Sequence, residues 1–370
     1  MTENADTRRN DDHDHDHDHD HGNGNGNGNG NGNGREARRG MGRAAAERET
    51  GHGADRDGEG AVGTVLVTSG TGKTGRRVAE RLTALGVPVR SGSRTGSSGA
   101  GAGGLSAGTG DSGADTGGPG ARAADSASRA GTVPFDWQDD SGWAEALRGA
   151  RAAYVAYYPD LAVPGAAGAM AAFGRTAAAC GVRRVVLLSG RGEPQAAVAE
   201  EALRGAAGAA EVTVVRSAFF AQNFSEGALL EGVLGGEVAF PAGTTAEPFV
   251  DLDDLADVVV AALTGPGHAE AVYELTGPRS LTFAQAAEEL ARAAGRPVRY
   301  VPVTGPAYAS LLEEFEVPGP EAGFLAELFE TLLDGHNTAT TDDVQRVLGR
   351  EPKDFSAFAR EAAGDGAWHG

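Results

Sequence analysis

Residues 64–75 read Thr-Val-Leu-Val-Thr-Ser-Gly-Thr-Gly-Lys-Thr-Gly, and this stretch decides the fold. The apolar run 65–67 predicts a strand, and a helical spacing of apolar residues begins directly after the glycines, at Val78, Leu82 and Leu85. Three glycines fit the pattern G-x-G-x-x-G, namely Gly70, Gly72 and Gly75. Glycines permit a tight turn and close approach to a pyrophosphate, whose charge faces the free N–H groups of the helix start. The unit therefore predicts the beginning of a dinucleotide-binding fold.

Two other interpretations of the glycine turn stay open. Gly72-Lys73-Thr74 is similar to the end of a P-loop, but that motif needs a glycine five residues before Gly72, where the chain has Val67. The second alternative is a turn with a purely structural role. The flanking strand and helix favour the dinucleotide site over both.

Low-complexity segments limit the length of chain that can fold. Residues 1–60 contain alternating Asp and His, Asn-Gly repeats and a polar stretch, so ordering them would cost backbone entropy without compensating burial. We predict a disordered tail there and a flexible Gly/Ser/Ala/Asp-rich insertion at 95–131. The tail contains five histidines, His13, His15, His17, His19 and His21, which could bind metal weakly, but a solvated tail without a metal site is favoured.

Charge and cysteine content exclude several classes of protein. The net charge is −20, from 32 basic and 52 acidic residues, which argues against general affinity for nucleic acid or an anionic membrane. The single cysteine, Cys180, cannot form an intrachain disulfide, which suits a reducing compartment. With no leader pattern and no membrane-length apolar run, we expect a cytoplasmic protein whose partner is a small-molecule substrate; a protein partner is left open.

The chain after residue 61 alternates strand and helix patterns. Strands are expected at 87–91, 133–137, 152–158, 182–189 and 212–216, with helices at 141–147, 165–179 and 196–206 between them. This order predicts an α/β fold of the Rossmann type, with a doubly wound parallel sheet. We assign 61–216 to a NAD(P)-binding domain and 217–370 to a smaller, mostly helical substrate lobe. In that lobe Asp253 or Asp254 is expected to cap one helix and Thr282 another.

The end of the second strand indicates the cofactor. NAD-specific sites place a carboxylate about 20 residues beyond the glycine turn. This chain has no Asp or Glu between Glu80 and Asp111, and instead places Ser93 and Arg94 there. A guanidinium and a hydroxyl suit a 2′-phosphate, so NADP(H) is favoured over NAD.

These features resemble the NmrA-like, atypical short-chain dehydrogenases, and among them the reductases grouped with ergot-alkaloid (festuclavine-type) synthesis. The resemblance covers about residues 62–365, and the matching stretches are 69–75, 91–94, 135–137, 182–189, 215–224, 249–256, 273–278 and 342–349. It implies that residues 71–74 meet the pyrophosphate, Arg94 the 2′-phosphate and Asp136 the adenine amino group. The predicted cofactor-binding residues are Ser69, Gly70, Thr71, Gly72, Lys73, Thr74, Gly75, Ser93, Arg94 and Asp136. Ser69 departs from the family, which commonly has glycine there.

The catalytic pair of ordinary short-chain dehydrogenases, Tyr-x-x-x-Lys, is missing. The chain has two lysines, Lys73 and Lys353, and neither follows one of the six tyrosines by four residues. Hydride transfer must then rely on positioning a nicotinamide against an already electrophilic acceptor, such as an imine, an iminium ion or a quinone. We therefore predict an NADPH-dependent reductase; the alternative is a non-catalytic NADP(H)-sensing regulator that acts through a protein partner.

Substrate and proton-donor candidates follow the later strands. The stretch after the sixth strand could stack and orient a flat substrate, through Phe219, Phe220, Gln222, Asn223 and Phe224, although core packing is an equal alternative for Phe220. Tyr157, Tyr158 and Ser189 are candidate proton donors, with packing or capping as the alternative. Asp251, Asp253 and Asp254 are assigned to helix capping rather than to a metal.

Overall fold

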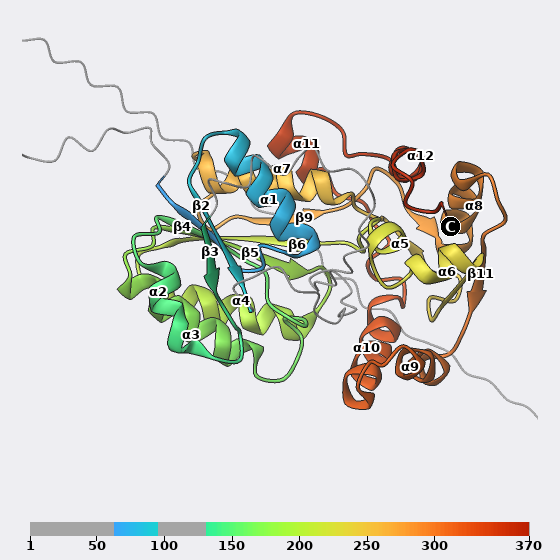
Figure 1. The fold of residues 1–370 in the computed structure, drawn as a ribbon, viewed down its shortest axis with the longest axis horizontal. Helices are drawn as coiled ribbons and strands as arrows, with labels where there is room; N and C mark the ends of the chain where they lie inside the picture. Colours follow the sequence, from blue (N-terminus) through green and yellow to red (C-terminus); the bar gives the residue numbers. More distant parts are fainter. Residues whose placement is uncertain (1–62, 95–130, 370) are drawn as a thin grey trace, which may run out of the picture. The chain divides into compact units, whose positions relative to one another are not determined.

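The computed structural model describes residues 63–94 and 131–369 (Figure 1). A seven-stranded sheet has the order β3-β2-β1-β4-β5-β6-β9, and every neighbouring pair is parallel. Its strands are β1 (Val65–Val67), β2 (Val89–Ser93), β3 (Gly131–Pro134), β4 (Ala152–Val155), β5 (Arg184–Gly190), β6 (Glu211–Ser217) and β9 (Val272–Leu275). The predicted Rossmann-type α/β fold is confirmed.

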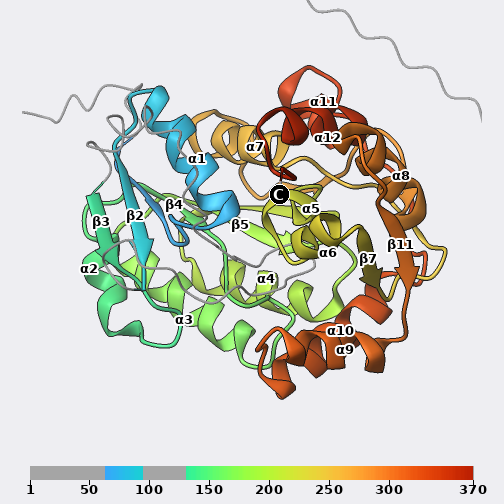
Figure 2. The same ribbon diagram turned by 45° about the vertical axis from the view of Figure 1, so that its right-hand side comes forward.

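Helices cover both faces of this sheet (Figures 1 and 2). One face packs on α1 (Lys73–Ala84), α7 (Leu252–Thr264) and α11 (Asp343–Leu348), and the other on α2 (Trp143–Leu147), α3 (Ala166–Ala179) and α4 (Pro194–Ala206). The side-chain alternation of β1 explains both layers, because Val65 and Val67 enter the first core and Leu66 enters the second. Such strands are apolar on both faces, which produced the continuous apolar runs in the sequence.

A third core lies beyond the carboxyl ends of the strands and is rich in phenylalanine. Its helices are α5 (Asn223–Glu226), α6 (Leu230–Gly235), α8 (Phe283–Ala294), α9 (Gly305–Glu314), α10 (Gly319–Leu332) and α12 (Phe355–Gly364). Two small sheets join them: β8 (Ala246–Glu247) pairs with β10 (Leu281–Thr282), and β7 (Glu237–Phe240) pairs with β11 (Arg299–Pro302). The order of elements along the chain does not match the layers here. Both α7 and β9 come after residue 216, yet β9 is a strand of the large sheet and α7 is one of the helices that cover it.

Two helix starts test the capping predictions. Thr282 caps α8 with a full capping box, in which Gln285 reciprocates, as predicted. The cap of α7 differs from the prediction, because Asp251, rather than Asp253 or Asp254, accepts the N–H of Asp253 at 2.7 Å. Three acids in four residues suit a helix start equally well, so only the position where the helix begins identifies the cap.

Several predictions concern residues outside the described ranges. The Asp/His tail with His13 to His21, the predicted disordered segment 1–60 and all but Gly131 of the predicted insertion 95–131 belong there. Within residues 63–94 and 131–369, no helix combines the length and apolar character needed to cross a bilayer. Among the same residues, no group of three or more His, Cys, Asp or Glu side chains is arranged to hold a metal ion.

Candidate functional site

The glycine turn lies between β1 and α1, and two of its glycines are required by close contacts. A Cβ atom on Gly75 would lie 1.7 Å from the carbonyl oxygen of Ser69, and one on Gly70 would lie 2.5 Å from the Cβ of Ser91. Gly72 occupies the N-cap position of α1 and offers no side chain. The first turn of that helix contains no acid, so its N–H end can face an anion.

Lys73 is buried at the first position of α1, with 3% of its surface exposed. Its Nζ donates to Oδ1 of Asn223 at 2.7 Å and lies 5.9 Å from the centre of the Phe220 ring. Thr74 beside it is also buried, whereas Thr71 is exposed. The structure thus places one predicted pyrophosphate residue against two residues predicted for the substrate.

The remaining predicted cofactor residues lie at the ends of neighbouring strands. Ser93 ends β2, and the exposed Arg94 guanidinium lies 5.0 Å from the centre of the Tyr158 ring, in a cation–π contact. Asp136 follows β3 and accepts the N–H of Gln138 through Oδ1 at 3.0 Å. Because β3, β2, β1 and β4 are adjacent, these groups share one edge of the sheet. Their roles toward a dinucleotide stay predictions.

The phenylalanines of the predicted substrate stretch lie inside the protein. Phe219, Phe220 and Phe224 are at most 5% exposed. Phe219 and Phe224 pack edge-on or tilted against other rings of the third core, whereas Phe220 joins the core between the sheet and α7. In this conformation they offer no open face for stacking a substrate. Core packing, the alternative weighed for Phe220, describes all three rings here.

The amides of the same stretch are also engaged by the protein. Gln222 donates through Nε2 to Oδ2 of Asp251 at 3.0 Å and accepts the N–H of Leu252 through Oε1 at 2.9 Å. It therefore connects the start of α5 to the start of α7. Asn223 accepts from Lys73, as described above, so both amides have structural partners in the described residues.

Two of the predicted proton donors, Tyr157 and Ser189, are enclosed. Ser189 is completely buried and donates to Oε1 of Glu200 at 2.6 Å, while Glu200 also pairs with Arg216 at 2.7 Å. Tyr157 is 5% exposed and packs against Trp137, with ring centres 5.0 Å apart. Burial raises the pKa of the Tyr157 phenol. Their catalytic roles stay predictions.

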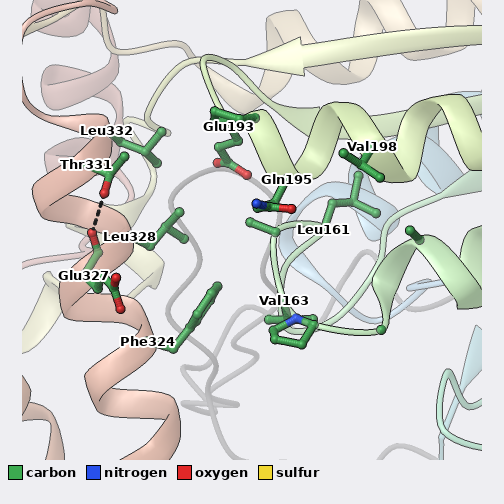
Figure 3. A pocket seen from close by; sticks show the side chains of 15 residues that line it. Leu161, Val163, Glu193, Gln195, Val198, Phe324, Glu327, Leu328, Thr331 and Leu332 are labelled. Atoms are coloured by element: carbon green, nitrogen blue, oxygen red, sulfur yellow. Dashed lines mark hydrogen bonds between the residues drawn. The ribbon is translucent and has the colours of Figure 1, made fainter.

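A cavity of about 500 Å³ opens beside these strand ends (Figure 3). Its walls are the loop after β4 (residues 161–165), the start of α4 (193–198) and one face of α10, which presents Phe324, Leu328 and Leu332. The lining is mostly apolar, and the volume suits a small organic molecule. A second, water-sized cavity of about 10 Å³ shares Glu193 and Leu332 with the first.

Glu193 is the notable polar group between the two cavities. It is the N-cap residue of α4 and is 5% exposed. Burial, followed by the nearby charge and hydrogen bond of Asp160, holds the pKa of the Glu193 carboxyl well above its ordinary value. Sequence reasoning missed both acids; the one available signal is that Asp160 lies two residues, and Glu193 four residues, beyond the end of a predicted strand, where ligands bind in such sheets.

Glu247 faces the smaller cavity from β8. It is 4% exposed and accepts the N–H of Phe219 at 3.2 Å. Burial raises the pKa of its carboxyl to about 7, although the positive charge of Arg191 opposes the shift. The inner wall of the site therefore holds two buried carboxyl groups that retain protons more readily than exposed ones.

Comparisons with known proteins identify the family. The chain is 31% identical to the uncharacterized oxidoreductase YesF of Bacillus subtilis (strain 168) over 300 residues, which is 80% of this chain and 93% of YesF. It is 27% identical to the agroclavine dehydrogenase of Claviceps fusiformis over 80% of this chain and 96% of that one. No family model matches. The chain belongs to the NmrA-like family of atypical short-chain dehydrogenases and reductases.

Solved structures agree on the fold. The triphenylmethane reductase of Citrobacter sp., complexed with NADP(H), superposes with a TM-score of 0.61 at 20% identity. The match covers 80% of this chain and 99% of the reductase. At this level of identity the likeness establishes the architecture alone.

Proposed function

We propose that the protein is an NADPH-dependent reductase that transfers hydride to a conjugated small molecule. The cavity carries this proposal, because it opens at the carboxyl ends of β4 and β5, next to the strand that ends in the glycine turn. In open parallel sheets the dinucleotide lies across these strand ends, with its phosphates at the first turn. A ligand in the cavity would then lie beyond the phosphates, toward the nicotinamide end.

The residues present fit an NADP(H) molecule. Gly70 and Gly75 let the turn pack closely against Ser91 and Ser69, where any Cβ atom would clash, and α1 begins at this turn with no acid in its first turn. Arg94 is exposed at the end of β2 and can pair with a 2′-phosphate. The complex of the structurally similar triphenylmethane reductase with NADP(H) supports the same cofactor. When bound, the nicotinamide supplies a hydride; the protein orients it and excludes water.

The cavity and the missing Tyr-x-x-x-Lys pair together support the class of substrate. An apolar wall of Leu and Phe side chains favours a flat or compact apolar molecule over a sugar or a peptide. Without a tyrosine and lysine to polarise a simple carbonyl, the acceptor has to be electrophilic by its own conjugation. Quinones, conjugated carbonyl compounds, imines and iminium ions meet this requirement.

A steady-state assay tests the proposal by following NADPH oxidation with a panel of quinones, iminium salts and azo dyes. Val198 lines the cavity yet is 55% exposed, so Val198→Trp should narrow the site without disturbing the core. We expect it to lower kcat/KM for the acceptors while NADPH affinity stays the same. Leu85→Trp is the matched control, since Leu85 is 62% exposed at the far end of α1.

Two results would contradict the proposed reductase or its substrate site. Tight NADPH binding without turnover of any acceptor would contradict the reductase and support the non-catalytic sensor. A pull-down whose partner depends on the redox state of the cofactor would then identify that alternative. Equal effects of Val198→Trp and Leu85→Trp would contradict the cavity as the substrate site.

A further inference from the structure

Glu193 is placed to act on a molecule in the large cavity. It lies between the large and the small cavity, and Figure 3 shows its carboxyl directed into the space between α4 and α10. Only 5% of the residue is exposed, and no N–H or hydroxyl group of the described residues donates to its Oε2 atom. A buried carboxylate oxygen without a donor costs free energy, so this carboxyl is favoured in its protonated form, beside a cavity that can hold a ligand.

The backbone around Glu193 is shaped to hold that carboxyl. A Cβ atom on Gly190 would lie 1.8 Å from Oε1 and 2.4 Å from Oε2 of Glu193. The carboxyl therefore occupies the volume that any other residue at 190 would fill. Pro194 directly follows and fixes the first turn of α4, so the side chain leaves the backbone from a rigid position.

The neighbouring groups favour a proton on Glu193. Asp160 of the loop after β4 contacts it by a hydrogen bond, and two carboxyl groups can share one only if one of them is protonated. Glu200 adds negative charge from α4, but is neutralised by Arg216 from β6. Glu327 borders the cavity from α10; Glu247 and Arg191 border the smaller one.

We propose that Glu193 donates the proton that accompanies hydride transfer, and that the site takes neutral acceptors whose oxygen or nitrogen must be protonated. This inference rests on the proposed reductase function. The acceptor carbon gains the hydride of the reduced nicotinamide dinucleotide, and the π electrons move to its conjugated oxygen or nitrogen. That atom forms an O–H or N–H bond as the O–H bond of Glu193 breaks. The substrate is reduced by two electrons, the dinucleotide is oxidised, and Glu193 is left as a carboxylate.

The variant Glu193→Gln tests the proton transfer with two acceptors in parallel. A quinone needs both hydride and proton, whereas a preformed iminium ion needs only hydride. We expect quinone turnover to fall by roughly 100-fold or more, the usual contribution of a general acid, and iminium turnover to change little. Glu201→Gln is the control, because Glu201 is an exposed acid on the same helix, paired only with Arg204 in the described ion pairs.

A readout independent of turnover follows the proton itself. Difference infrared spectroscopy of the wild-type protein at neutral pH should show a protonated carboxyl band, besides that of Glu247, that is lost in Glu193→Gln and kept in Glu201→Gln. NADPH affinity should be the same in all three proteins. Above the pKa of Glu193, quinone turnover should fall with rising pH, while iminium turnover should not.

The results of these experiments distinguish failure of the proton-donor role of Glu193 from failure of the reductase function on which that role rests. Loss of quinone and iminium turnover together in Glu193→Gln would assign the residue a structural role and overturn the inference. Unchanged quinone turnover, or the same protonated carboxyl bands in the wild type and in Glu193→Gln, would do the same. Should Glu193→Gln fail to fold, Gly190→Ala displaces the same carboxyl. It must likewise lower quinone turnover and leave iminium turnover nearly unchanged. A wild type that reduces neither acceptor would instead refute the reductase.

Discussion

Replacing Gly75 by alanine tests the phosphate-binding turn most sharply. The new Cβ would lie 1.7 Å from the Ser69 carbonyl oxygen, and contacts below 3.0 Å are essentially never seen, so the atoms must separate by roughly 1.3 Å. That oxygen accepts the N–H of Gly72 at 3.1 Å, so moving it opens the turn and redirects its N–H groups. A hydrogen bond to a charged group contributes about 1.5–3 kcal/mol. Losing two of them would weaken NADPH binding by on the order of 10²- to 10⁴-fold.

The assay is a fluorescence titration of NADPH, with thermal unfolding as the check on folding. Gly205→Ala is the matched control, because a Cβ on that residue of α4 meets no atom within 4 Å. It should leave the Kd unchanged and stabilise the helix by about 0.5–1 kcal/mol. Binding of NADPH by folded Gly75→Ala within threefold of the wild type would refute the role given to the turn.

Three further substitutions test other parts of the account. Arg94→Glu should weaken NADPH by roughly tenfold or more and leave NADH unaffected, because a carboxylate repels the 2′-phosphate; equal loss for both nucleotides in competition titrations would contradict this. Gln222→Leu should lower the free energy of unfolding by about 2 kcal/mol or more in urea titrations, since it strips the buried Asp251 of a partner; a change in KM with no loss of stability would instead support the predicted substrate role. The Arg279 guanidinium lowers the pKa of Asp354, so the stabilisation from this pair is present above the ordinary carboxyl pKa of about 4 and is lost as pH falls below it. Asp354→Asn should therefore reduce the fall in the free energy of unfolding at acidic pH. An unchanged pH dependence would exclude the pair as its cause.

Local patterns were sufficient to predict the sheet layer. The run at Val65–Val67 and the spacing of Val78 and Leu82 depend on residues a few positions apart, so both could be predicted from the sequence alone. The glycine turn could be predicted for the same reason. The close contact of Gly75 with Ser69 explains sterically why this position requires glycine. Ser69 itself keeps its carbonyl in the turn and donates its hydroxyl to the Ala156 carbonyl at 2.9 Å.

Long-range contacts explain what the sequence could not predict. Asp160 and Glu193 are brought together because β4 and β5 are neighbours, and no local pattern reports that pairing. The phenylalanines from Phe219 onward show the complementary problem, since an aromatic run has the same composition in a pocket wall and in a core. Their burial depends on rings such as Phe249 and Phe283, which come later in the chain.

We expect the turn between β1 and α1 to bind NADP(H), and the rest of the proposed function depends on this binding. Calorimetric titration of the whole chain with NADPH and NADP⁺, each in competition with NADH, tests it directly. We expect one site per chain and tighter binding of the 2′-phosphorylated nucleotides. Absence of binding heat for both NADPH and NADP⁺, at several temperatures, would contradict binding at this turn.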